Sequence, residues 1–200
     1  MLAAMTLTLL AGGCRGAKLS DADAQLERGE YFDASKTYRK IYNKLTKREE
    51  RPLRGEVAYK MATCYRKLNM AARASAAYQN AIRYEYPDSM AFLYLGRSLQ
   101  AEGKYAPAMD AYMTYLEWDP DNQYAKEAMK GCRQAIEAKN KPKSRYVVKN
   151  AKLFNSRRAD FAPMFLDKSL DQIYFTSTNE KSTGENRSEI TGMKKSDIWY

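Results

Sequence analysis

Apolar and polar positions along the chain follow two different periods. Between residues 19 and 139, small and apolar residues recur every three or four positions, which is typical of amphipathic helices. Beyond Tyr146 the helical period ends, and short runs of β-branched and aromatic residues predict strands at residues 146–148, 160–165, 172–177 and 196–200. We therefore expect a mainly α chain that ends in an antiparallel β segment.

The helical part repeats itself. Three pairs of equivalent positions are 34 residues apart: Ala62 and Gly96, Ala74 and Ala108, Tyr78 and Tyr112. The small residues would let paired helices approach closely, and the tyrosines would fill the space between pairs. This spacing and pattern resemble the tetratricopeptide repeat, which implies a solenoid of stacked helical pairs that docks other proteins.

An earlier copy and a closing helix extend the array. The second half of the earlier copy runs through Gly29, Tyr31, Ala34, Tyr38 and Ile41, after a helix at residues 19–28. Extra residues at 46–52 predict a longer second helix or a loop before the next copy. After Pro120, a stripe at helical spacing predicts a capping helix at residues 122–139: Tyr124, Ala128, Cys132, Ala135 and Ile136. Three repeats and a cap are enough for a stable array.

The first helix of each pair would form the inner face of such an array. Its predicted exposed positions, which we assign to partner binding, are Glu56, Tyr59, Thr63, Arg66, Met90, Leu93, Arg97 and Gln100. These side chains would hold an extended or helical segment of another protein. The alternative is a solvated or self-packed face.

The N-terminus resembles a bacterial lipoprotein signal. Residues 2–13 are uncharged and mostly apolar, too short to span a bilayer, and Ala11, Gly12 and Gly13 precede Cys14. The resemblance implies acylation of Cys14 and attachment to the outer membrane. Ala11 stands where a leucine is usual, and a basic leading segment is missing. The alternative is a buried apolar helix with an incidental cysteine.

Composition narrows the chemistry. The chain has no histidine, which disfavours the common nucleophile pairs and zinc sites, so we predict no enzyme activity, no metal site and no cofactor. The formal net charge is +10. Eight basic residues and no acidic one lie in residues 139–158, next to Pro142, which indicates a linker and gives no support for nucleic-acid binding. Cys64 and Cys132 lie in separate helices, and both a disulfide and two free thiols remain open.

The strand-like pieces resemble the opening blade of a WD-like β-propeller. The pieces that carry this likeness are residues 155–163, 173–177 and 196–199. One blade would leave open sheet edges, so we expect either a fragment of a longer protein or a small three-stranded sheet packed on the helical cap.

The order of these parts resembles the PorE-like, OmpA-family outer-membrane lipoproteins of the type IX secretion system. The predicted division is a signal and tether at 1–18, repeats and cap at 19–139, a basic linker at 140–152 and a propeller start at 153–200. The resemblance implies a lipid-anchored periplasmic scaffold for envelope secretion or motility proteins, with peptidoglycan bound only by a further domain. The alternatives are a cytoplasmic tetratricopeptide adaptor and the non-catalytic part of a propeller-containing peptidase. Asp160 and Asp167 are interpreted as turn residues, and Ser177 has no histidine to activate it.

Overall fold

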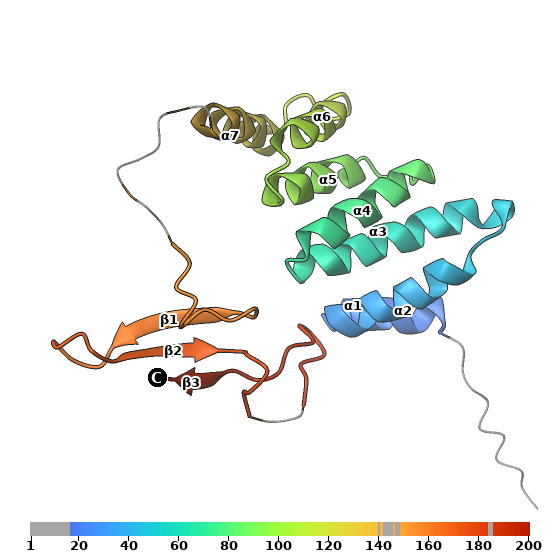
Figure 1. Ribbon diagram of the computed structural model, residues 1–200. Helices are drawn as coiled ribbons and strands as arrows, with labels where there is room; N and C mark the ends of the chain where they lie inside the picture. The colour runs from blue at the N-terminus through green and yellow to red at the C-terminus, as the bar shows by residue number, and fades with distance from the viewer. Residues whose placement is uncertain (1–16, 140, 142–145, 147–148, 184–185) are drawn as a thin grey trace, which may run out of the picture.

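The computed structural model describes residues 17–139, 141, 146, 149–183 and 186–200 of the chain. The helices are α1 (Leu19–Glu27), α2 (Tyr31–Lys44), η1, a 3-10 turn (Arg48–Glu50), α3 (Arg51–Lys67), α4 (Ala71–Arg83), α5 (Met90–Ala101), α6 (Tyr105–Leu116) and α7 (Gln123–Lys139). The strands are β1 (Asp160–Phe165), β2 (Ile173–Ser177) and β3 (Asp197–Trp199). Figure 1 shows the seven α-helices stacked in chain order, with the sheet beside the first pair.

Equivalent residues of the repeats form one continuous core. Tyr38, Tyr78 and Tyr112 are fully buried, and so are the alanines one turn earlier in α2, α4 and α6. Gly96 lies under the Tyr112 ring so closely that a Cβ there would be 2.7 Å from Cε1. The small residues therefore make room for the tyrosines, as the 34-residue pattern predicts.

The turns inside the three helical pairs are also equivalent. Gly29, Asn69 and Gly103 follow the first helix of each pair, and all three have a positive φ, of 77°, 56° and 74°. A left-handed residue at this position ends a helix and satisfies its last carbonyls, and glycine and asparagine adopt it at the lowest cost. The common turn gives each pair the same geometry.

The extra residues between the first two copies lengthen α3, the first helix of the second pair. η1 occupies part of the insertion, and α3 then begins at Arg51, with Pro52 in its first turn. As a result α3 has 17 residues, whereas the equivalent α5 has 12. The predicted alternative of a longer second helix is wrong, because α2 has 14 residues and the equivalent α4 has 13. The insertion instead forms a short turn and lengthens the helix that follows.

The predicted stripe of the capping helix is partly wrong. In α7, Ala125 and Cys132 are buried, whereas Tyr124 is 48% and Ile136 36% exposed. The helix packs on α6 and touches only part of α5, so it buries a narrower stripe than a helix inside the array.

The cysteines of the array are free thiols. Cys64 and Cys132 are both buried and unpaired, which leaves the disulfide alternative unsupported. Burial raises the pKa of the Cys64 thiol to about 12. Both side chains act as small apolar groups in the core.

The C-terminal part is a three-stranded antiparallel sheet in the order β1-β2-β3. The pairing of β1 with β2 shifts between Phe161 and Met164, where Ala162 has a φ of 52° and Pro163 has no N–H to donate. Three predicted strands are thus present. Of the fourth, residues 147 and 148 lie outside the described residues, and Tyr146 is outside any strand.

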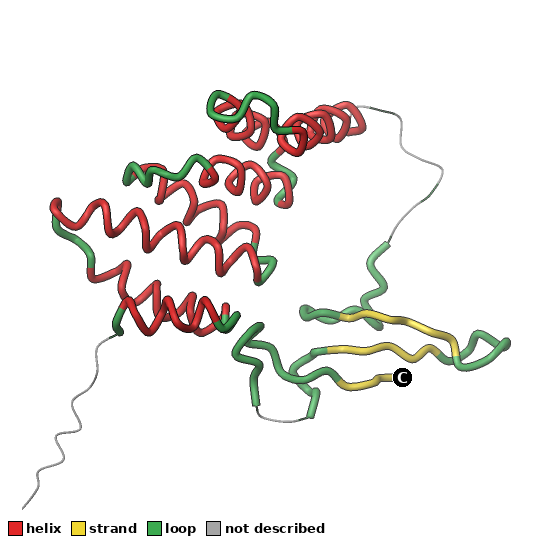
Figure 2. Tube along the Cα trace, turned by 180° about the vertical axis from the view of Figure 1, so that it is seen from behind, coloured by secondary structure: helices red, strands yellow, loops and turns green. Residues whose placement is uncertain are grey.

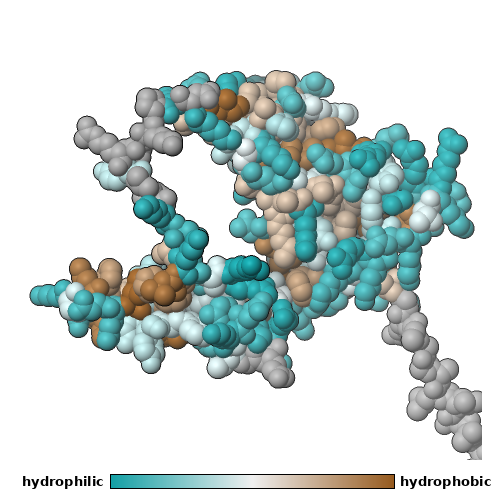
Figure 3. Space-filling view, viewed as in Figure 1, coloured by the Kyte–Doolittle hydropathy of each residue, from teal (hydrophilic) through white to brown (hydrophobic). Residues whose placement is uncertain are grey.

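The sheet buries few of its apolar side chains. Phe161, Met164, Phe165, Leu166 and Ile198 are exposed, and Figure 3 shows apolar side chains gathered over this part of the molecule. The sheet meets the helices through residues 189–192, which lie at the start of α2, as Figures 1 and 2 both show. The expected packing against the capping helix is therefore replaced by a contact at the opposite end of the array. A propeller blade remains a prediction.

Among the described residues, no helix has both the length and the apolar character needed to cross a membrane.

Candidate partner-binding face

Seven of the eight predicted partner-binding residues reach the surface. Arg97 is exposed, and six others are half-buried: Glu56, Tyr59, Thr63, Arg66, Met90 and Gln100. Leu93 is 7% exposed and belongs to the core, so its assignment as an exposed position is wrong. α5 lies inside the array with neighbours on most sides, and the adjacent Tyr94 takes the surface position. We call the surface formed by α1, α3, α5 and α7 the first-helix face.

A buried tyrosine supports this face in each repeat. The Tyr38 hydroxyl donates to Asp23 Oδ1 at 2.5 Å, and the Tyr112 hydroxyl donates to Gln100 Oε1 at 2.8 Å. In the middle repeat the Tyr78 hydroxyl accepts from Arg66 Nε at 3.2 Å and lies 3.2 Å from the Thr63 hydroxyl. Each ring packs in the core, and its hydroxyl forms a hydrogen bond from the core side to a side chain of the first helix.

The first-repeat end of the face carries a network of ion pairs. Lys60 Nζ lies 2.9 Å from Asp23 Oδ1 and 2.7 Å from Glu56 Oε1, which joins α1 to α3. Burial alone would raise the pKa of Asp23, but the Tyr38 hydroxyl and the Lys60 ammonium outweigh it and lower the pKa below 3.8. One cation thus serves two carboxylates, so the cluster carries a net charge of −1 and this end of the face offers no excess positive charge to a partner.

Arginine and tyrosine stack between successive first helices. The Arg66 guanidinium of α3 lies 4.0 Å from the centre of the Tyr94 ring in α5, and that of Arg97 lies 5.9 Å from the Tyr124 ring in α7. Tyr59 stacks on Tyr86 with ring centres 4.5 Å apart. Such contacts stabilise the spacing of the repeats and fix the orientation of the two guanidinium groups.

A cleft of about 370 Å³ opens at the C-terminal ends of α3 and α5. It is lined by Arg66, Lys67, Asn69, Ala71, Arg97, Ser98 and Ala101. Among the described residues, no carboxylate lies within 4.0 Å of the three cationic groups, although ion pairs occur elsewhere in the array. We call this the basic cleft. It brings three cations together at the edge of the first-helix face, where α3 turns into α4, and no described carboxylate pairs with them.

Other chemistry considered from the sequence is placed as follows. Cys14 lies outside the described residues. The described residues contain no group of three histidine, cysteine or acidic residues arranged to hold a metal ion. The Ser177 hydroxyl donates a hydrogen bond to Asp160 Oδ1 at 2.6 Å, and Asp167 accepts one from the Ser169 amide. Asp160 is the first residue of β1, so its interpretation as a turn residue is wrong, whereas Asp167 lies in the bend after β1.

Sequence reasoning missed several residues of this face. Asp23, Lys60, Tyr94 and Tyr124 contribute to it as directly as the predicted positions. The repeat offset could have suggested Asp23, because the first copy has its own buried tyrosine at Tyr38. The arginine and tyrosine stacks could not be found in this way, since they join neighbouring helices rather than equivalent positions.

Comparisons with known proteins agree on the helical part. The tetratricopeptide repeat profile matches residues 56–89 and 90–122. The C-terminal TPR-containing domain of a Plasmodium falciparum FK506-binding protein is 15% identical, with a TM-score of 0.51 over 61% of this chain and 88% of that chain.

Two further solved structures have lower TM-scores. The Sgt2 TPR domain of Aspergillus fumigatus is 20% identical, with a TM-score of 0.49, 66% of this chain covered and 87% of that chain. The first TPR of Spaghetti (RPAP3), bound to an HSP90 peptide, is 21% identical, with a TM-score of 0.48, 59% of this chain covered and 89% of that chain. No curated protein matches the chain. Residues 56–122 therefore carry two tetratricopeptide repeats, and the stacked helical pairs form a solenoid around them.

Proposed function

We propose that this chain is a non-enzymatic scaffold that binds a segment of a partner protein along its first-helix face. The observation that carries the proposal is the basic cleft, where Arg66, Lys67 and Arg97 line one hollow and, within the described part of the chain, form no ion pair with a carboxylate. A partner segment rich in aspartate or glutamate would supply the missing charge.

The contacts that hold the side chains of the first-helix face in place favour a binding role over a merely solvated surface. Arg66 is held by the Tyr78 hydroxyl and by the Tyr94 ring, so its guanidinium is oriented before any partner arrives. A preorganised side chain loses less conformational entropy on binding than a free one. The neighbouring tyrosines add apolar area with a polar edge, which is the composition found at protein interfaces.

A peptide-binding measurement tests this proposal. We expect a fluorescein-labelled hexaglutamate peptide to bind the full chain, and the Arg97→Gln variant to bind it at least about fivefold more weakly, since a charge-assisted contact is lost. Fluorescence anisotropy gives the dissociation constants, with hexalysine as the opposite-charge probe.

The matched control removes an equal charge elsewhere. Lys40 is exposed on α2, a second helix of the first repeat. If Lys40→Gln weakened the binding of hexaglutamate as much as Arg97→Gln, the attraction would reflect net charge alone, and the first-helix face would lose its assigned role.

We further propose that the scaffold is lipid-anchored through Cys14 at the periplasmic face of the outer membrane, where its partners would be envelope secretion or motility proteins. The support is the apolar segment and small residues before Cys14. The Cys14→Ala change should release the protein from the membrane fraction, whereas Cys132→Ala should not. Membrane association that survives Cys14→Ala would refute the anchor at Cys14. A parent chain absent from the membrane fraction would favour an adaptor without an anchor.

A further inference from the structure

A small hairpin at residues 187–194 lies between the sheet and the first helical pair. Arg187 and Lys194 form an antiparallel bridge, the Ser188 amide donates to the Met193 carbonyl at 3.0 Å, and the Gly192 amide donates to the Ser188 carbonyl. Arg187 Nη1 also donates to the Gly192 carbonyl at 3.2 Å. These bonds give the hairpin a defined shape of its own.

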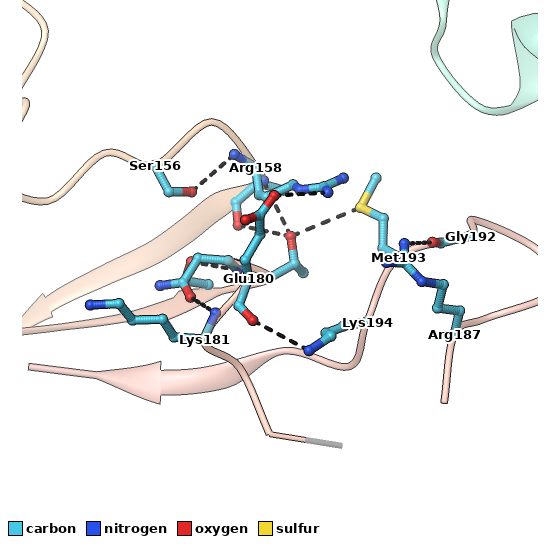
Figure 4. A network of polar contacts seen from close by, with 12 residues as sticks. Ser156, Arg158, Glu180, Lys181, Arg187, Gly192, Met193 and Lys194 are labelled. Carbon is cyan, nitrogen blue, oxygen red and sulfur yellow. Dashed lines mark hydrogen bonds and ion pairs between the residues drawn. The ribbon is translucent and has the colours of Figure 1, made fainter. Parts of the chain in front are cut away.

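Side-chain contacts hold the hairpin to the sheet. Lys194 Nζ donates to the Glu180 carbonyl at 3.3 Å, and the Thr178 hydroxyl contacts Met193 Sδ at 3.9 Å. Figure 4 shows these contacts converging where Arg158 and Glu180 form an ion pair next to the strands. The base of the hairpin is therefore joined to the residues that follow β2.

The tip of the hairpin contacts the start of α2. The Phe32 amide donates to the carbonyls of Glu189 and Ile190 at 3.2 and 3.1 Å. This amide lies in the first turn of α2, where the helix supplies no acceptor, and no side chain caps α2. The hairpin satisfies a donor that would otherwise need water.

Gly192 fits against the Phe32 ring with no space to spare. A Cβ at Gly192 would lie 2.3 Å from Phe32 Cδ2 and Cε2, and the φ of Gly192 is 69°. The Lys36 ammonium lies over the same ring, 3.9 Å from its centre. The equivalent positions of α4 and α6 are Ala72 and Ala106, both exposed, so the first repeat departs from the others where the hairpin lands.

We propose that the hairpin at 187–194 is an intramolecular clasp that fastens the C-terminal sheet to the first helical pair through Phe32 and Gly192. The array and the sheet then hold fixed relative positions, and a protein bound to one meets the other in a single orientation. The clasp stands on contacts away from the first-helix face and does not depend on how that face is used.

Amide hydrogen exchange on the full chain tests the clasp. The Phe32 amide should exchange slowly in the parent chain and at least about tenfold faster in Gly192→Ala, because the added methyl group pushes the hairpin away. The Ala34 amide bonds to the Glu30 carbonyl within the helix and should keep its rate in both chains. Fast exchange at Phe32 in the parent chain would overturn the proposal.

Two further variants separate the clasp from other effects of substitution. Gly103 also has a positive φ, of 74°, but a Cβ there would meet nothing within 4 Å, so Gly103→Ala adds backbone strain without a clash and should leave Phe32 protected. Phe32→Ala keeps the hairpin's own bonds and should increase the radius of gyration in X-ray scattering. An unchanged radius in Phe32→Ala would show that the ring does not fasten the sheet.

Discussion

The helical array and the C-terminal sheet use apolar side chains in opposite ways. In the array, tyrosines such as Tyr78 are fully buried between small residues, and every helical pair covers its neighbour. In the sheet, Ile198 is 75% exposed, and the buried positions among the described residues of 160–199 are Ser177, Ser182 and Gly192. The array stabilises itself by burying apolar area, whereas the sheet depends on its hydrogen bonds and on its clasp.

The largest effect should come from emptying the array's core. Tyr78→Ala removes a fully buried ring together with the hydroxyl that supports Arg66, so we expect a loss of about 3 to 5 kcal/mol in the free energy of unfolding. Urea denaturation followed by circular dichroism measures it. Replacing the exposed Met113 by alanine should lower the free energy of unfolding by less than about 0.5 kcal/mol. Equal losses in the two variants would contradict a core centred on the tyrosines.

The second-largest loss of stability should come from overpacking the core. A Cβ at Gly96 would lie 2.7 Å from the Tyr112 ring, so Gly96→Ala should destabilise the array by about 1 to 3 kcal/mol. Gly131 is the matched control in α7, where a Cβ would lie 3.7 Å from Gln100 Nε2 in ordinary contact. Gly131→Ala should stabilise the helix by about 0.5 to 1 kcal/mol. Opposite signs in the same denaturation assay are the expected result.

A smaller effect involves the polar end of a buried tyrosine. Tyr38→Phe keeps the ring but removes the hydrogen bond to the Asp23 carboxylate, which should cost about 1.5 kcal/mol at neutral pH.

The same contact makes the array sensitive to acid. The pKa of Asp23 is lower in the folded chain than its ordinary value of 3.8, so its contribution is present above that pH and is lost as the pH falls through the folded-state pKa. The parent chain should therefore lose more stability between about pH 5 and pH 2 than the Asp23→Asn variant, as urea midpoints would show. A parallel pH dependence of the two chains would rule out this contribution.

The smallest effect is expected in the sheet. Ile198→Thr keeps a β-branched residue at an exposed position, so the free energy of unfolding should change by less than about 0.5 kcal/mol. Thermal denaturation measures it. A loss as large as that of a core residue would show that Ile198 is buried in solution, and the contrast between array and sheet would fail at this position.

The sequence predicted the array better than it predicted the face. The 34-residue offset placed Ala62, Gly96, Tyr78 and Tyr112 correctly, because every repeat must solve the same packing problem. The helical spacing within single helices was less reliable: it placed Leu93 at the surface and made the buried stripe of α7 too wide, because burial depends on how many neighbours a helix has. The clasp at Gly192 gave no periodic signal, because it joins segments far apart in the chain and occurs once.

The two buried thiols give the array internal reporters. Cys64 lies in the middle repeat and Cys132 in the closing helix, and burial raises the pKa of both, so a thiol-specific reagent reaches each one only when its own surroundings open. The order in which the two sulfur atoms become modified therefore records whether the solenoid frays from its capped end inward or opens all at once.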